Sequence, residues 1–233
     1  AEAGFFSADR LDSRRVIGSP LEGHPNMRVL PSVEASTGSL GQGLSIGLGH
    51  ALAARIDDLE YRVYVLIGDG EADEGQIWEA AMSAAKYQVD NLTAILDYNR
   101  FQQTGAVTEV MPSLQPIGDK WQAFGWDVRE IDGHDMAAIC DALDWADEQR
   151  DQPSVIIANT VKGKGISFVE GQAGYHKINQ YTRYGTLVLA TIQSFFIALW
   201  LEDRSGTVFR GFQVVNNPGW GFRIVTVLTL ACG

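Results

Sequence analysis

Cysteine and basic side chains are both scarce in this chain of 233 residues. The two cysteines, Cys140 and Cys232, lie outside any CxxC spacing, which excludes a disulfide scaffold and a cysteine-based zinc site. Only 18 Lys and Arg stand against 29 Asp and Glu, so the net charge is −11. Without a basic stripe to neutralise phosphates, we expect no nucleic-acid partner. The acidity fits a dispersed, cytoplasmic protein.

Long apolar runs are missing as well. The longest covers residues 187–201, and these 15 residues fall short of the roughly 20 that a membrane span needs. We therefore expect a buried helix or strand in this run, and no membrane partner. The overall composition, with 45% hydrophobic and 20% charged residues, is that of an ordinary globular protein.

Apolar segments alternate with helical patterns through the first two thirds of the chain. This alternation predicts an α/β fold, three-layer α/β/α, with a mostly parallel sheet covered by helices on both faces. After about residue 178 the alternation stops, so we expect a domain over 1–178 and an unassigned tail over 179–233. The expected strands are 62–67, 92–96, 127–131 and 155–158, and the expected main helices are 44–54, 74–89 and 135–150.

Asp69 and Asn99 each follow an expected strand. Asp69 lies between two glycines, and Asn99 comes thirty positions later, which is about the length of a strand, a crossover helix and a second parallel strand. Both side chains would then lie at the carboxyl ends of adjacent strands, where open α/β sheets bind ligands. Oxygen ligands beside glycine predict a Mg²⁺-diphosphate site. Alone, the Gly-Asp-Gly motif favours a plain turn, and Asn99 could be a strand-end cap, whereas the pair at this spacing favours the metal site.

Several other polar residues carry weaker signals. His24, in a Gly-His-Pro loop, is suited to hydrogen-bond a diphosphate or a sugar hydroxyl, or to be a plain surface residue. His176 follows a Gly/Ala loop and could reach a ligand. The Gly-rich turn at 37–43 offers backbone amides to an anion, although helix packing explains it too. Glu74 and Glu79 belong to an acidic cluster near a helix start, to which composition alone gives no catalytic role.

Seven motifs, in the right order, resemble transketolase. The resemblance is closest to the N-terminal, diphosphate-binding half that forms a separate subunit in some bacteria and archaea, and it covers roughly residues 1–178. It is specific because so many separate motifs agree in order. The motifs are His24-Pro25 and the segments 36–43, 68–80, 97–99, 120–126, 131–135 and 160–165.

The resemblance implies thiamine diphosphate and Mg²⁺ as cofactors. Asp69 and Asn99 would be the side-chain metal ligands, and Phe101 would offer its backbone carbonyl. Gly70 would pack on the diphosphate, and Asn99 would also belong to the cofactor-binding set. These roles agree with the Mg²⁺-diphosphate site predicted at the two strand ends. The resemblance adds the Phe101 carbonyl as a third metal ligand.

The resemblance also implies contacts around the reactive part of the cofactor. Gly38 and Leu40 would line the aminopyrimidine. His24 would face the reactive ring and the incoming sugar, and His176 would lie near the diphosphate or the substrate. These four positions complete the expected binding and catalytic groups on this chain.

A partner subunit follows from what the chain does not show. The pyrimidine-binding half, with its activating glutamate, is not recognisable, and the initial helices of the family with their histidine are missing. Glu74 and Glu79 would join an acidic network where two active sites meet. We therefore expect a homo- or hetero-oligomer with a pyrimidine-domain (C-terminal) transketolase subunit, such as a dimer, and inactivity of this chain alone.

The function implied is that of a transketolase, a transferase of the pentose phosphate pathway type. It would move a two-carbon ketol unit between sugar phosphate substrates. Two rivals within the thiamine-dependent class are a 1-deoxyxylulose-phosphate synthase and a dehydrogenase E1 component. A further alternative is a non-catalytic fragment that at most binds cofactor, with a tail arising from a frameshift or a fusion.

Overall fold

The computed structural model describes residues 1–166, 171–204, 215 and 218–232. The side chains of residues 171–176, 179, 203, 204, 231 and 232 lie outside that description. The chain divides into two compact units, Ala1–Lys162 and Gly163–Gly233. Each unit is considered by itself.

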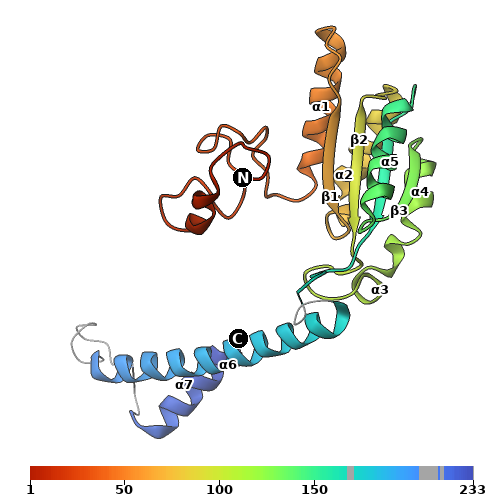
Figure 1. Cartoon of the computed structure of the whole chain (residues 1–233). Helices are drawn as coiled ribbons and strands as arrows, with labels where there is room; N and C mark the ends of the chain where they lie inside the picture. The colour runs from red at the N-terminus through yellow and green to blue at the C-terminus, as the bar shows by residue number, and fades with distance from the viewer. Residues whose placement is uncertain (167–170, 205–214, 216–217, 233) are drawn as a thin grey trace. The chain divides into compact units, whose positions relative to one another are not determined.

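A four-stranded parallel sheet forms the centre of the first unit (Figure 1). Its strands are β1 (Val63–Gly68), β2 (Leu92–Tyr98), β3 (Asp127–Asp132) and β4 (Ser154–Asn159), in the spatial order β1-β2-β4-β3. The predicted α/β class and the parallel sheet are confirmed, and so are all four strands to within a few residues. The expected neighbours β1 and β2 pair directly, with Gly68 opposite Asp97.

One helix precedes the first strand, and further helices occupy the connections between the strands. Asp135 begins one of them as predicted, because its carboxylate accepts hydrogen bonds from the backbone amides of Ala137 (2.9 Å) and Ala138 (3.3 Å). The helices are α1 (Gln42–Ile56), α2 (Gly75–Lys86), α3 (Val107–Val110), α4 (Ile117–Ala123) and α5 (Met136–Glu148), with 3₁₀ turns at Ala8–Ser13, Glu71–Asp73 and Pro112–Leu114.

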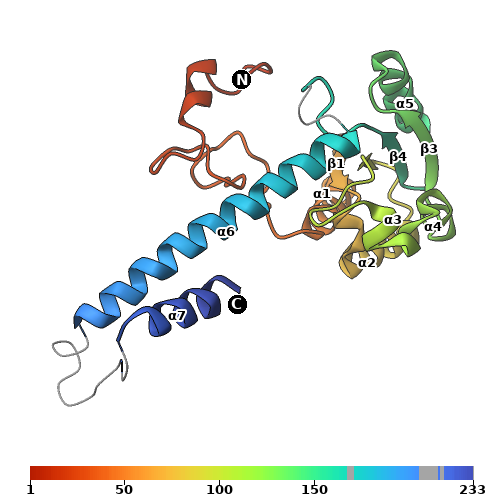
Figure 2. The ribbon, with the colours of Figure 1, turned by 90° about the horizontal axis from the view of Figure 1, so that it is seen from below.

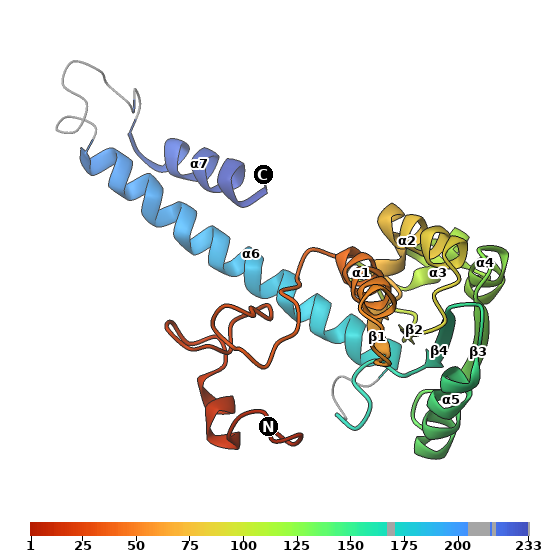
Figure 3. The ribbon, with the colours of Figure 1, turned by 90° about the horizontal axis from the view of Figure 1, so that it is seen from above.

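One face of the sheet carries the main core. Helices α1, α2 and α4 pack there, opposite α5 (Figures 2 and 3). Three indole rings lie in this layer: Trp121 is 5.2 Å from Trp78 and 4.8 Å from Trp126, measured between ring centroids. The Trp126 indole N–H donates to the carbonyl of Ala81 at 2.9 Å, so its one polar atom is satisfied in the core.

The other face is covered only in part. Helix α5 packs on β3 and β4, with Ala142 and Ala146 against Ile156. Over β1, Tyr64 is 44% exposed and Leu66 is 72% exposed. The expectation of a sheet covered on both faces is therefore wrong over β1, because no described helix of this unit lies against that strand's outer side.

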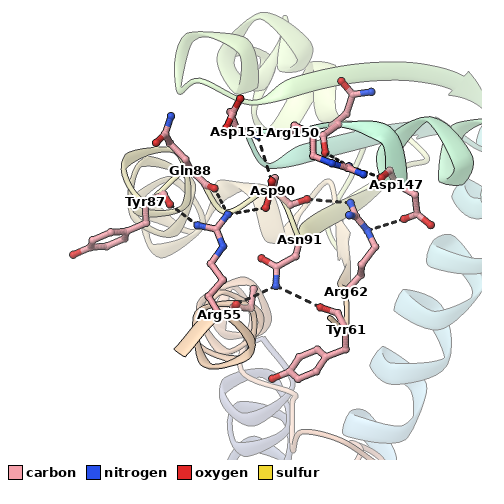
Figure 4. Close-up of polar contacts among 12 residues, drawn as sticks. Arg55, Tyr61, Arg62, Tyr87, Gln88, Asp90, Asn91, Asp147, Arg150 and Asp151 are labelled. Atoms are coloured by element: carbon pink, nitrogen blue, oxygen red, sulfur yellow. Dashed lines mark hydrogen bonds and ion pairs between the residues drawn. The ribbon is translucent and has the colours of Figure 1, made fainter. Parts of the chain in front are cut away.

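A polar cluster ties the amino ends of the strands together (Figure 4). Arg62, just before β1, donates to the carbonyls of Asp90 (3.0 Å) and Ala146 (2.7 Å) and pairs with the Asp147 carboxylate at 2.7 Å. Arg55 at the end of α1 pairs with the Asp90 carboxylate at 2.7 Å. These two arginines fasten α1, the loop before β2 and α5 at the end of the sheet that lies away from Asp69.

The described residues of the second unit form two helices, α6 (Gly171–Arg204) and α7 (Trp220–Cys232). The rings of Phe195 and Trp220 stack at 6.4 Å, and Arg223 pairs with Glu202 at 2.7 Å, which holds α7 against α6. The sequence predicts a buried helix or strand over residues 187–201, and these residues lie in helix α6. Its predicted burial is wrong, because most described side chains of α6 are exposed.

Two glycines of α1 offer a matched test of its packing on the sheet. A Cβ on Gly47 would lie 2.4 Å from Cγ2 of Val65, a stiff side chain, whereas a Cβ on Gly49 would meet nothing within 4 Å. We expect Gly47→Ala to lower the free energy of unfolding by about 1–3 kcal/mol. We expect Gly49→Ala to raise it by about 0.5–1 kcal/mol through helix propensity. Urea denaturation of both variants measures this, and equal effects would contradict the close approach.

Candidate functional site

The carboxyl ends of β1 and β2 bring two predicted site residues to one edge of the sheet. Asp69 directly follows β1 and is only 2% exposed, and its Oδ2 atom has no hydrogen-bond partner among the described residues. Asn99 directly follows the neighbouring strand β2 and is half-buried. A buried carboxylate oxygen without a partner is costly, so a ligand at this position would stabilise the carboxylate.

The surroundings of Asp69 disfavour its charge. Burial raises the pKa of the Asp69 carboxyl above its ordinary value, and the nearby Asp97 carboxylate raises it further. Backbone hydrogen bonds from Arg100 and Gly70, and the Lys162 ammonium, act in the opposite direction and are outweighed. A divalent cation would supply the positive charge that this pocket lacks.

The loop after β2 turns back toward Asp69. The side-chain oxygen of Asn99 accepts from the Phe101 amide at 3.0 Å, and its amide nitrogen donates to Asp97 at 3.1 Å. Between them Arg100 has a φ of 66°, in the left-handed region. Its backbone amide hydrogen-bonds Asp69, so the loop carrying Asn99 and Phe101 is in contact with the buried carboxylate.

The donor set at this edge fits a magnesium ion. The carbonyl of Phe101 accepts from the Lys162 ammonium at 3.4 Å, so it faces a positive charge. Together with the Asp69 carboxylate and the Asn99 oxygen it offers oxygen atoms only, as Mg²⁺ prefers. In the described part of the chain no three His, Cys, Asp or Glu side chains group around a metal position. A single carboxylate would therefore leave most coordination positions to phosphate and water.

Two predicted binding glycines lie against named side chains. A Cβ on Gly38, whose φ is +148°, would come within 2.8 Å of Cγ of His24. The structure thus brings together two residues expected to line the reactive part of a cofactor. A Cβ on Gly70 would lie 3.4 Å from Cγ of Gln102, so Gly70 lies against the loop that follows Asn99.

Glu71 is a site residue that sequence reasoning missed. Its carboxylate accepts from the amide of Gly41 at 2.8 Å and from the amide of Gly68 at 3.2 Å. It therefore fastens the Gly-rich turn to the end of β1, next to Asp69. An acidic cluster is the only signal of this role in the sequence, because Gly41 and Glu71 are thirty positions apart and meet only in the fold.

The other predicted site residues are exposed, or their side chains lie outside the description. Leu40 is 53% exposed, although its carbonyl accepts from Gln76 at 2.7 Å. Glu74 precedes α2 and Glu79 lies within it, and both are exposed. The side chain of His176 lies outside the described residues. The roles expected for these four residues stay predictions, as do the metal-ligand roles of Asp69, Asn99 and Phe101.

Comparison with protein families identifies the chain. Residues 4–179 match the family described as transketolase, thiamine diphosphate binding domain. The chain belongs to the transketolase family. The predicted resemblance is thereby confirmed, and it places the edge formed by Asp69 and the loop after β2 within a thiamine diphosphate-binding domain.

Curated relatives among the transketolases cover most of the matched region. The chain is 47% identical over 173 residues to one subunit of the apulose-4-phosphate transketolase of Phocaeicola vulgatus, which covers 74% of this chain and 61% of that one. It is 46% identical over 175 residues to the 6-deoxy-6-sulfo-D-fructose transketolase subunit SqwG of a Clostridium species, covering 75% and 63%. The chain thus spans about three fifths of the length of these curated relatives.

Solved transketolase structures share the fold. The transketolase of Campylobacter jejuni superposes with a TM-score of 0.68 at 33% identity, over 73% of this chain and 27% of that one. A transketolase variant from Pichia stipitis, in complex with xylulose 5-phosphate, superposes with a TM-score of 0.68 at 31% identity, over 72% and 26%. The parallel sheet with flanking helices is therefore the transketolase thiamine diphosphate-binding fold.

The raised pKa of Asp69 predicts how this transketolase domain responds to pH. The folded state binds more protons than the unfolded state between the ordinary pKa of 3.8 and the raised folded value, so ionising Asp69 destabilises the fold as pH rises through that window. We expect Asp69→Asn, which removes this charge, to raise the unfolding free energy of the cofactor-free chain at neutral pH by on the order of 1 kcal/mol.

Chemical denaturation of wild type and variant across the acidic range measures the effect. The gain from Asp69→Asn should shrink as pH falls below the folded pKa, because wild-type Asp69 then becomes neutral too. Asp144→Asn, an exposed substitution in α5, is the matched control and should show no such trend. A variant less stable than wild type at every pH would contradict the account.

Proposed function

We propose that this chain is the thiamine diphosphate- and Mg²⁺-binding N-terminal subunit of a cytoplasmic transketolase. The observation that carries the proposal is the buried Asp69 carboxylate, with one oxygen unpartnered, at a strand end of a thiamine diphosphate-binding domain. Such an oxygen is stabilised by a metal ion that also binds phosphate. The proposal has three parts, which are a bound Mg²⁺ ion, the ketol-transfer reaction and a partner chain.

The site residues divide between the metal and the two ends of the cofactor. Asp69, Asn99 and the Phe101 carbonyl would bind Mg²⁺, and Gly70 would leave room for the diphosphate. His24, packed against Gly38, would face the reactive end with Leu40 nearby. Bound thiamine diphosphate supplies the carbanion chemistry as an ylid. The protein contributes position and electrostatics, with Lys162 beside the Phe101 carbonyl adding positive charge near the phosphates.

A partner chain completes the proposed enzyme. The relatives described above are named as subunits of transketolases, and this chain matches only about three fifths of their length. Glu74 and Glu79 are exposed, which leaves them accessible to a second chain. We assign them to the contact with a pyrimidine-domain subunit that closes the cofactor pocket. The pair would then transfer a two-carbon ketol unit between sugar phosphates.

Calorimetry with thiamine diphosphate and Mg²⁺ tests the binding claim. We expect the full chain to bind the cofactor only with the metal, and to gain about 2.7 kcal/mol of stability at a cofactor concentration one hundred times Kd. Asp69→Ala should weaken binding by at least about 100-fold, because it removes the only charged ligand. Asp144→Ala on the surface of α5 serves as control. Unchanged cofactor uptake by Asp69→Ala would refute the site.

Activity assays test the two-part claim and the choice of reaction. We expect no ketol transfer from the chain alone, and transfer from a ketose phosphate when a pyrimidine-domain subunit is added. Turnover of pyruvate in place of the ketose phosphate would favour a synthase or dehydrogenase instead. Measurable transfer by this chain without a partner would contradict the need for a second subunit, whereas cofactor binding without any activity in either mixture would favour the non-catalytic alternative.

A further inference from the structure

Helix α6 contains a long stretch without any charged side chain. Residues 184–201 are uncharged and lie between Arg183 and Glu202. The helical segment Gln180–Glu202 has 23 residues and a mean hydropathy of 1.6. At about 1.5 Å per residue such a helix is about 34 Å long, which matches the hydrocarbon thickness of about 30 Å in a bilayer. Its length and composition therefore suit a membrane span.

The stretch is far less buried than the core helix of a soluble unit. Only 11% of its most apolar window is buried. Leu187, Val188 and Leu189 are 51%, 57% and 61% exposed, and successive helical positions point about 100° apart. Phe196 is 65% exposed further along. A helix that is apolar all round needs an apolar environment on every side, and α7 covers only one of its sides.

Three hydroxyls of the two helices bond to carbonyls of their own helix. The hydroxyl of Thr191 donates to the Leu187 carbonyl at 2.8 Å, and that of Ser194 donates to the Ala190 carbonyl at 2.6 Å. In α7 the Thr229 hydroxyl donates to a carbonyl of the preceding turn in the same way. Hydroxyls bonded to the preceding turn cost less in hydrocarbon than free ones.

Aromatic side chains lie near both ends of the stretch. Tyr181 and Tyr184 stand at its start, and Trp200 stands at its end; all three are more than half exposed. Tyrosine and tryptophan gather at the two interfaces of a membrane because their rings are apolar and their tips are polar. Arg223 neutralises Glu202 at the end of the stretch, where an isolated charge would be costly.

The two units also differ in the sign of their net charge. After residue 162 there are six Lys and Arg against three Asp and Glu, whereas residues 1–162 hold 12 against 26. The acidity of the whole chain thus belongs to the first unit, and the helical unit is mildly basic. Basic side chains beside an apolar helix are attracted to the anionic surface of a membrane.

We propose that α6 spans a lipid bilayer, with α7 packed against it in the same membrane. A second copy of the chain explains the exposed surface of α6 less well than lipid does. One more helix would cover one side of α6 and leave leucines exposed on its other sides. The expectation of no membrane rests on the 15-residue run 187–201, which is shorter than a span. The uncharged stretch of the helix is longer, because residues 184–186 extend that run. This proposal does not depend on the proposed function of the first unit.

Flotation of the full chain with phosphatidylcholine vesicles tests the proposal. The chain is synthesised in their presence, and we expect it to float with them and to remain bound after an alkaline carbonate wash. Ile192→Arg places a charge at the middle of the stretch and should lower the ratio of membrane-bound to free chain by about 100-fold. Thr182→Arg adds the same charge outside the stretch, at an exposed position, and should float like the wild type.

Protease treatment of the floated vesicles gives a second readout that does not rely on a variant. A spanning helix should leave a protected fragment containing residues 184–201, identified by mass spectrometry. A chain that stays in the soluble fraction, whether as a monomer or as a dimer, would overturn the proposal. So would equal flotation of Ile192→Arg and wild type, or the absence of a protected fragment.

Discussion

The buried, half-unpartnered carboxylate of Asp69 is the constraint on which the site depends. A folded chain would ordinarily expose such a group or pair both of its oxygens, because an unsatisfied buried charge lowers stability. Here the end of β1 holds it in place, Glu71 fastens the neighbouring backbone, and the loop after β2 bends onto it through Arg100. The buried Asp69 carboxylate thus lowers the stability of the first unit. In the proposed function, a cation bound together with a diphosphate would remove this cost.

Parallel pairing is what makes this arrangement possible. When β1 and β2 run in the same direction, the residues that follow them reach the same edge, and the pairing of Gly68 with Asp97 sets Asp69 beside the loop that follows β2. The arginines at the opposite edge stabilise the amino ends of the same strands, with Arg62 bonding to α5 and Arg55 to the loop before β2. The cluster around Arg55 and Arg62 and the candidate site thus lie at opposite ends of the same strands.

The features that could be predicted are those that depend on local patterns. Alternating strands and helices, the cap at Asp135 and the thirty-residue spacing of Asp69 and Asn99 are local, and they lead to the observed sheet. Features that depend on distant partners could not be predicted. Glu71 meets the Gly-rich turn only in the fold, and Leu66 is exposed because nothing described covers it. An apolar run likewise does not reveal what surrounds it, which is why burial of the tail is a wrong prediction.

The two units differ in how their apolar side chains are arranged relative to water. The two proposals are therefore independent of each other. In the first unit, apolar side chains gather on one side of each helix and leave the acidic residues to water. In α6 they surround the helix, and the hydroxyls of Thr191 and Ser194, which interrupt them, bond to its own carbonyls. A sheet-based cofactor site needs no membrane, and an all-apolar helix needs no cofactor. If both proposals hold, the acidic unit would remain in water beside a membrane whose anionic lipids repel it, with its site open to soluble sugar phosphates.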